Sequence, residues 1–184
     1  MARIDPIPME NMTKQQKRIN DEIAGSRGGG PAKGPFALWL QTPELADKAN
    51  SFGSYLRQNT TVPQRLVELA VLVVARTYTA QYEWYAHEKY VENVGLDPKI
   101  VDAIRTRTEP EIKNADEQIV YAVAQELSVQ RTLSDETYKR AIEELGETTV
   151  LELITIIGFY TMVAIVLVSY QVDIPDGGEK PLKD

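Results

Sequence analysis

The sequence predicts an all-α fold in a single domain, residues 1–184, with about seven to eight helices. Two apolar runs, at residues 66–75 and 153–168, are longer than typical strands and therefore indicate buried helices. Helix-start signals, in which Ser, Thr, Asn or Asp precedes Pro or an acidic residue, recur along the chain. No stretch alternates convincingly between apolar and polar residues, which is the pattern of a half-buried strand.

Residues 1–33 are predicted to hold an N-terminal helix and a Gly-rich loop. A charged helix over residues 14–24 follows Thr13, a suitable N-cap. The loop at residues 25–35 does not match a phosphate-binding loop, because Lys33 is followed by Gly and Pro rather than by Ser or Thr. The loop is either a flexible connection or a lid over a site. A short apolar segment that packs down after it is expected at residues 36–40.

Three helices are predicted in the middle of the chain, at residues 43–58, 63–76 and 81–95. Thr42 is a good N-cap, and Pro43 suits the first helical position. Gly95 fits the glycine that commonly terminates a helix.

Four further helices are predicted toward the C-terminus, at residues 98–105, from 114 through at least 127, at 135–146 and at 148–170. Asp97 and Ser134 are the expected N-caps for the first and third of them. The polar tail at residues 172–184 contains Pro and Gly and is predicted to be loosely ordered.

Composition limits the function. Twenty Lys and Arg against 27 Asp and Glu give a net charge of -7, which argues against a nucleic-acid partner. The chain has no cysteine, so disulfides, thiolate metal sites and thiol redox chemistry are excluded. The first residues lack the apolar run of a signal peptide, so a cytoplasmic location is expected.

The apolar run at residues 153–168 falls short of the roughly 20 residues that span a membrane, and Glu152 and Gln171 lie at its margins. No membrane partner is therefore predicted. A helix that is apolar on all faces otherwise lies in a core or a subunit interface, so we expect a homo-oligomer.

Three polar residues stand out as a candidate acid–base cluster. Glu68 is the single charged residue in the run at 66–75, and a carboxylate in such surroundings must find a partner or stay protonated. Glu83 and His87 are four residues apart, so they share one face of the next helix. His87 is the only histidine of the chain.

With these residues in place, the chain resembles the carboxymuconolactone decarboxylase family, within the superfamily that also contains the AhpD-type alkylhydroperoxidases. The resemblance covers most of the chain from about Gly34 onward. It rests on GPF at 34–36, TPELA at 42–46, PQRLVELAVLVVAR at 63–76, YEWYAHE at 82–88 and Gly95.

In the peroxidase branch, the resemblance implies a glutamate, then a CxxC pair, then a histidine four residues after the second cysteine. Glu68 and His87 match the glutamate and the histidine, but the cysteine positions hold Ala80 and Glu83. Disulfide-mediated peroxide reduction is therefore excluded. The YEWxxH form is similar to the decarboxylase-like branch. The resemblance also implies a trimer or a hexamer, because members of the family are commonly one or the other.

The family reaction, as the resemblance implies it, is loss of CO2 from a small carboxylated lactone without a cofactor. Electrons from the breaking C–C bond reach the lactone carbonyl, and the resulting dienolate must be stabilised and then protonated on carbon. We assign His87 as the proton donor or proton shuttle, since its ordinary pKa is near neutrality. Glu68, with a raised pKa unless paired, would relay the proton or orient His87. Glu83 would orient His87 or act as a second acid or base.

The predicted substrate contacts are one cation and several aromatic walls. Arg57, Arg65 and Arg76 are the nearest cations in sequence, and Arg76 is taken as the carboxylate-binding candidate. The aromatic candidates are Phe36, Tyr82, Trp84 and Tyr160.

Alternatives remain at each position. Glu68 could be an ion-pair partner of Arg65 or Arg57, and Glu83 and His87 could be a solvated surface pair. Tyr82 and Trp84 could belong to the core or to an interface. No metal is predicted. Di-iron bundles use Glu and His three residues apart, usually in more than one such motif, whereas here the spacing is four and the chain has one histidine. A lactone hydrolase or isomerase, or a non-catalytic oligomer with a buried polar network, are the alternative functions.

Overall fold

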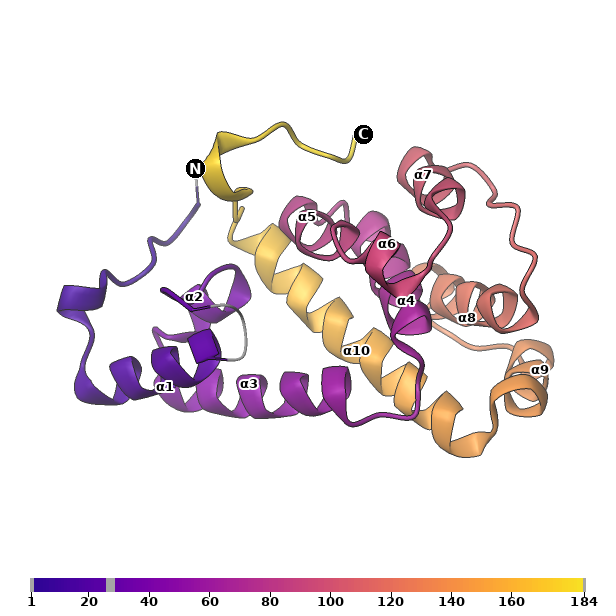
Figure 1. Ribbon diagram of the computed structural model, residues 1–184, viewed down its shortest axis with the longest axis horizontal. Coiled ribbons are helices and arrows are strands. Elements are labelled where there is room, and N and C mark those ends of the chain that lie inside the picture. The colour runs from indigo at the N-terminus through magenta and orange to yellow at the C-terminus, as the bar shows by residue number, and fades with distance from the viewer. Residues whose placement is uncertain (1, 26–28, 184) are drawn as a thin grey trace.

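The computed structural model describes residues 2–25 and 29–183, and this part of the chain is helical with no strand (Figure 1). The all-α prediction is confirmed. The elements are η1 (Met9–Asn11), α1 (Lys14–Gly25), α2 (Pro35–Trp39), α3 (Pro43–Gln58), α4 (Gln64–Thr77), α5 (Gln81–Glu88), α6 (Val91–Val94), α7 (Pro98–Thr106), α8 (Ala115–Gln125), η2 (Glu126–Gln130, a π-helix), α9 (Asp135–Leu145), α10 (Glu147–Ser169) and η3 (Pro175–Gly177).

Helices α4 and α10 form the centre of the core. Every residue of α4 from Leu66 to Arg76 is buried, which its nearly continuous apolar sequence explains. Helix α10 crosses the molecule and packs on α4, α5, α8 and α9, while α1, α2 and α3 lie on its other side (Figure 1). The short α5 lies against both α4 and α10, and this contact positions the candidate site.

Helix α10 is the one described helix that is long and apolar enough to cross a membrane, by length and composition only. Half of its most apolar window is buried inside the protein, as expected for a core helix. Its remaining apolar surface is exposed at Leu151, Met162, Ile165 and Val168.

Several predicted helix ends are formed by the expected groups. The Asp97 side chain accepts a hydrogen bond from the Lys99 amide, and Ser134 accepts one from Thr137. Thr13 and Gln16 exchange hydrogen bonds at the start of α1. The Thr42 side chain, by contrast, makes no capping hydrogen bond at α3.

The predicted helix over residues 81–95 is divided into α5 and α6. The Tyr90 amide donates to the carbonyl of His87, a tight i to i+3 bond that ends α5. The chain turns again at Gly95, whose φ of 75° and bonds to Glu92 and Val91 form the expected glycine cap. The division leaves Glu83 and His87 together on one short helix.

The tail differs from the loosely ordered segment that the sequence predicts. Leu182 is buried, and its backbone exchanges two hydrogen bonds with the Gln81 side chain, at 2.8 and 3.0 Å. The Lys183 carbonyl accepts a hydrogen bond of 2.7 Å from Arg76. The buried side chain of Leu182 and the two hydrogen bonds between its backbone and the Gln81 amide therefore hold the tail on the start of α5. Residue 184 lies outside the described residues.

The prediction of a connection or lid at residues 25–35 falls in part on residues 26–28, which lie outside the described residues. The end of the loop is held in place, because the Ala32 amide donates to the side chain of buried Asn20 at 2.8 Å. Gly34 then precedes α2 with a φ of 57°.

Candidate active site

Glu68, Glu83 and His87 form one buried cluster between α4 and α5. Glu68 is 6% exposed and Glu83 is 4% exposed, so both carboxylates are removed from water. The His87 side chain is 12% exposed. The sequence prediction of a shared cluster agrees with this arrangement, because α5 turns its Glu83 and His87 face toward the one carboxylate of α4.

The imidazole of His87 bridges the two carboxylates. Its Nδ1 lies 2.7 Å from Oε2 of Glu68, and its Nε2 lies 3.2 Å from Oε1 of Glu83. Arg65, an alternative partner for Glu68, instead pairs with Asp116 and Glu117. Glu68 is therefore a partner of His87, and the pair of Glu83 and His87 is buried rather than solvated.

The two carboxylates decide the protonation of His87. Burial by itself lowers the pKa of this group, but the hydrogen bonds and charges of Glu68 and Glu83 outweigh burial and raise the pKa from 6.5 to about 10. At neutral pH the ring is therefore an imidazolium whose two N–H groups both face carboxylates.

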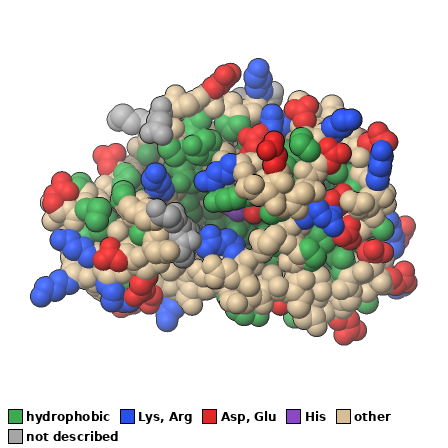
Figure 2. Space-filling view, viewed as in Figure 1, with side chains coloured by type: hydrophobic (Ala, Val, Ile, Leu, Met, Phe, Trp, Pro, Cys, Tyr) green, Lys and Arg blue, Asp and Glu red, His purple; other side chains and the backbone are tan. Residues whose placement is uncertain are grey.

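Aromatic side chains and a surface hollow adjoin the cluster. The ring of Tyr160, on α10, meets His87 edge to face at 5.1 Å between centroids, and Tyr90 lies at 6.5 Å. Figure 2 shows the single histidine at the floor of a hollow bordered by hydrophobic and basic side chains. Two other pockets, one at the end of α4 and one beside the tail, are lined by residues outside the cluster.

The other predicted substrate contacts lie elsewhere or have other neighbours. Trp84 is fully buried and donates from Nε1 to Glu88 at 2.9 Å, on the side of α5 that faces Arg105 of α7. Phe36 is buried and packs edge to face on Trp39 at 5.2 Å. These contacts are those of core residues, which was the alternative considered for Trp84.

Tyr82 and Arg76 have distinct placements. A Cβ on Gly34 would lie 2.3 Å from the Tyr82 ring, so the ring covers the start of α2. Arg76 is eight residues after Glu68, about 12 Å along the helix axis. Its guanidinium donates to the Lys183 carbonyl and to Thr79, and it lines a separate pocket.

Sequence reasoning did not name Tyr90, although its position three residues after His87 would have placed it near the same helix face. Among residues 2–25 and 29–183, no group of three or more His, Cys, Asp or Glu side chains has the geometry of a metal site. What the cluster can do chemically is hold a proton in apolar surroundings and pass it between an imidazole and two carboxylates.

Comparison with known proteins supports the fold. No family model matches the sequence, and no curated protein matches it. A solved structure that is similar is the uncharacterized peroxidase-related protein from Silicibacter sp. TM1040, with a TM-score of 0.77 and 13% sequence identity. The similarity covers 97% of this chain and 95% of that one, so the two proteins share their whole fold.

Proposed function

We propose that this protein is a cofactor-independent acid–base enzyme of the AhpD-like superfamily. We propose further that it is a carboxy-lyase that releases CO2 from a small carboxylated lactone or a related carboxylate. The observation that supports this most directly is an imidazolium held between two buried carboxylates at the floor of a surface hollow. The motifs at 63–76 and 82–88, and a fold shared with a peroxidase-related protein, agree with it.

The reaction uses the proton of the cluster. As the C–C bond to the substrate carboxylate breaks, its electron pair moves through the ring double bond to the lactone carbonyl, and CO2 leaves. The dienolate then takes a proton on carbon. A pKa of about 10 makes His87 a donor rather than a base at neutral pH. The Nε2–H is the proton to transfer, because its bond to Glu83 is the longer one.

Glu68 has a positioning role in this proposal. Its 2.7 Å contact with Nδ1 fixes the orientation of the ring and stabilises the imidazolium. The proton lost from Nε2 is regained from water, so the net reaction consumes one proton for each carboxylate converted. The basic side chains that border the hollow attract the anionic substrate.

A second candidate function is a non-catalytic oligomer in which the cluster is a buried polar network. Both ring nitrogens face carboxylates, which favours this role. Large apolar side chains are exposed on α3 and α10, among them Phe52, Tyr55, Leu151 and Ile165. A homo-oligomer, as a trimer or hexamer, is proposed under both functions.

The deciding experiment measures CO2 release from 4-carboxymuconolactone, followed by a panel of small lactones and carboxylates. His87→Gln and Glu68→Gln are tested with folding checked by circular dichroism, and Glu92→Gln, on the exposed side of α6, is the matched control. The enzyme proposal expects turnover by the wild type and the control, lost in the folded His87 variant. Absence of turnover over the whole panel would favour the polar network.

Sedimentation of the wild type tests the assembly separately. We expect a species larger than the monomer at micromolar protein concentration. A monomer would contradict the oligomer under either function.

A further inference from the structure

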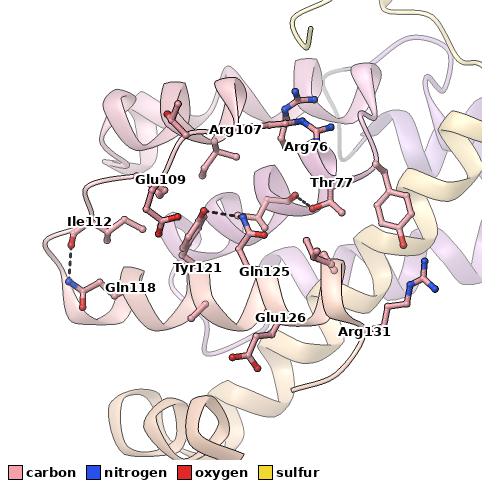
Figure 3. A pocket seen from close by; sticks show the side chains of 18 residues that line it. Arg76, Thr77, Arg107, Glu109, Ile112, Gln118, Tyr121, Gln125, Glu126 and Arg131 are labelled. Atoms are coloured by element: carbon pink, nitrogen blue, oxygen red, sulfur yellow. Dashed lines mark hydrogen bonds between the residues drawn. The ribbon is translucent and has the colours of Figure 1, made fainter. Parts of the chain in front are cut away.

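A separate pocket lies at the C-terminal end of α4, away from the cluster of Glu68, Glu83 and His87. It has a volume of about 1080 Å³, is open to the surface, and is lined by the end of α4, by α7 and the loop after it, by α8 and by η2. Figure 3 shows side chains from these segments directed toward a common space, with Tyr121 and Gln125 rising from α8. No part of the proposed function uses this pocket.

Two arginines that line the pocket are available to a ligand. Arg107 follows α7 and Arg131 follows η2, and both are exposed. Within the part of the chain that the structure describes, neither forms an ion pair with a carboxylate. Their backbones have φ of 58° and 61°, a region that L-residues adopt at a cost, so both segments hold an unfavourable conformation at the pocket.

One corner of the pocket concentrates positive charge. Arg107 and Arg76 each donate to the hydroxyl of Thr79, at 3.3 Å, so two guanidinium groups share one neutral acceptor. Figure 3 places both arginines on the same wall. An anion beside Arg107 would lower the electrostatic energy of this corner.

The lining of the pocket also contains a hydrogen-bonding group without a partner. Ser128 is 7% exposed, it lines the pocket, and its hydroxyl has no hydrogen-bond partner among the described residues. It belongs to η2, the π-helical segment, and such segments are frequent at functional sites. A buried hydroxyl without a partner is costly unless a ligand or water satisfies it.

The remaining lining suits an apolar body with a single negative charge. Val73, Ile104 and Ile112 contribute apolar surface, and Tyr121 contributes an aromatic face. Glu126 also lines the pocket, and its carboxylate accepts hydrogen bonds from Ser134 and Thr137. Glu109 also lines the pocket, and its charge disfavours a ligand with two negative groups.

We propose that this pocket binds a small monocarboxylate with an apolar or aromatic body, and that the ligand carboxylate pairs with Arg107. The body lies against Ile104, Ile112 and Tyr121, and a polar group at its far end reaches Ser128. Arg131 adds attraction from the opposite wall without a direct bond. The pocket is a binding site distinct from the cluster and independent of its chemistry.

The test is a titration of the ¹⁵N-labelled full-length protein with 3-phenylpropanoate, followed by amide chemical shifts. We expect saturable shifts confined to residues of the end of α4, α7, α8 and η2. The neutral alcohol 3-phenylpropan-1-ol, which has the same body, should bind about tenfold more weakly, because a charge-assisted bond to Arg107 is absent.

Variants locate the site. Arg107→Gln should weaken binding of 3-phenylpropanoate about tenfold, and Arg131→Gln about twofold to threefold, with a smaller salt dependence. Arg140→Gln, at an exposed position of α9, is the matched control and should bind as the wild type does. His87→Gln should also bind normally, which separates this site from the proposed active site.

The proposal would be overturned by an absence of saturable shifts at millimolar 3-phenylpropanoate, by equal affinity for the alcohol, or by unchanged affinity in Arg107→Gln. Shifts centred on α5 would likewise show that the carboxylate binds at the hollow of His87 instead. Sedimentation of each variant at the same concentration checks whether the pocket is occupied by a second copy of the chain. A wild type whose pocket is closed by self-association would also contradict the proposal.

Discussion

The Nδ1 of His87 lies 2.7 Å from Oε2 of Glu68, and these two residues, 19 positions apart in the sequence, join α5 to α4. The other ring nitrogen faces Glu83 from the same helix as His87, at 3.2 Å. The protonation of one imidazole is therefore linked to the packing of α5 on α4. Four predictions test this link and the surrounding structure.

The protonation of His87 can be observed directly, because it is the only histidine and contributes a single imidazole signal. We expect both ring nitrogens to remain protonated through neutral pH, in agreement with a pKa raised to about 10. Glu68→Gln should lower this pKa more than Glu83→Gln, since its contact is the shorter one. NMR titration of the ring carbon and nitrogen signals gives the result. An imidazole that titrates near 6.5 in the wild type would contradict the geometry.

Stability should depend on pH through the same group. The folded-state pKa of His87 is raised from 6.5 to about 10, so the folded protein binds a proton more tightly than the unfolded chain. The stabilisation is complete below pH 6.5 and is lost as the pH rises toward 10, with a slope of up to about 1.4 kcal/mol per pH unit. Urea unfolding at a series of pH values measures this slope. His87→Gln should lack it, and identical slopes for the two proteins would refute the assignment.

Two arginines with ion pairs of different burial should differ in their effect on stability. Arg65 bonds Asp116 at 2.6 Å and also Glu117, whose side chain is only 4% exposed. Arg65→Met leaves Glu117 buried without its cation, and we expect a loss of about 2 to 3 kcal/mol.

The control is Arg18→Met. Arg18 and Glu22 are 54% and 46% exposed, so their pair should contribute about 0.5 kcal/mol or less. Denaturant unfolding of both variants gives the comparison. Equal losses would mean that burial does not decide the contribution of these pairs.

Two glycine-to-alanine substitutions should change the free energy of unfolding in opposite directions. At Gly34 the new Cβ would lie 2.3 Å from the Tyr82 ring, and the φ of 57° disfavours any side chain, so we expect a loss of about 1 to 3 kcal/mol. Gly158 lies inside α10 with nothing within 4 Å of a new Cβ, and Gly158→Ala should stabilise by about 0.5 to 1 kcal/mol. Thermal unfolding distinguishes them, and a stable Gly34→Ala protein would place the Tyr82 ring elsewhere.

The sequence by itself determined the elements and the members of the cluster. Continuous apolar residues identified α4 and α10, because a helix with no polar face has to be buried. Asp97 and Ser134 marked true helix starts, since a capping side chain bonds its own neighbours and depends little on tertiary contacts. The cluster was also indicated by local spacing, because Glu68 lies alone in an apolar run and Glu83 lies four residues before His87 on the same helix face.

Only the tertiary structure decided which partners these groups have. Arg65 was the alternative partner considered for Glu68, but it pairs with Asp116 of α8, and Arg76 donates to the tail at Lys183. Trp84, one residue after Glu83, faces α7 and not the cluster. The tail docks because Gln81 and Leu182, 101 positions apart, match each other. Such contacts depend on how the helices rotate and pack, and local sequence patterns contain no record of that packing.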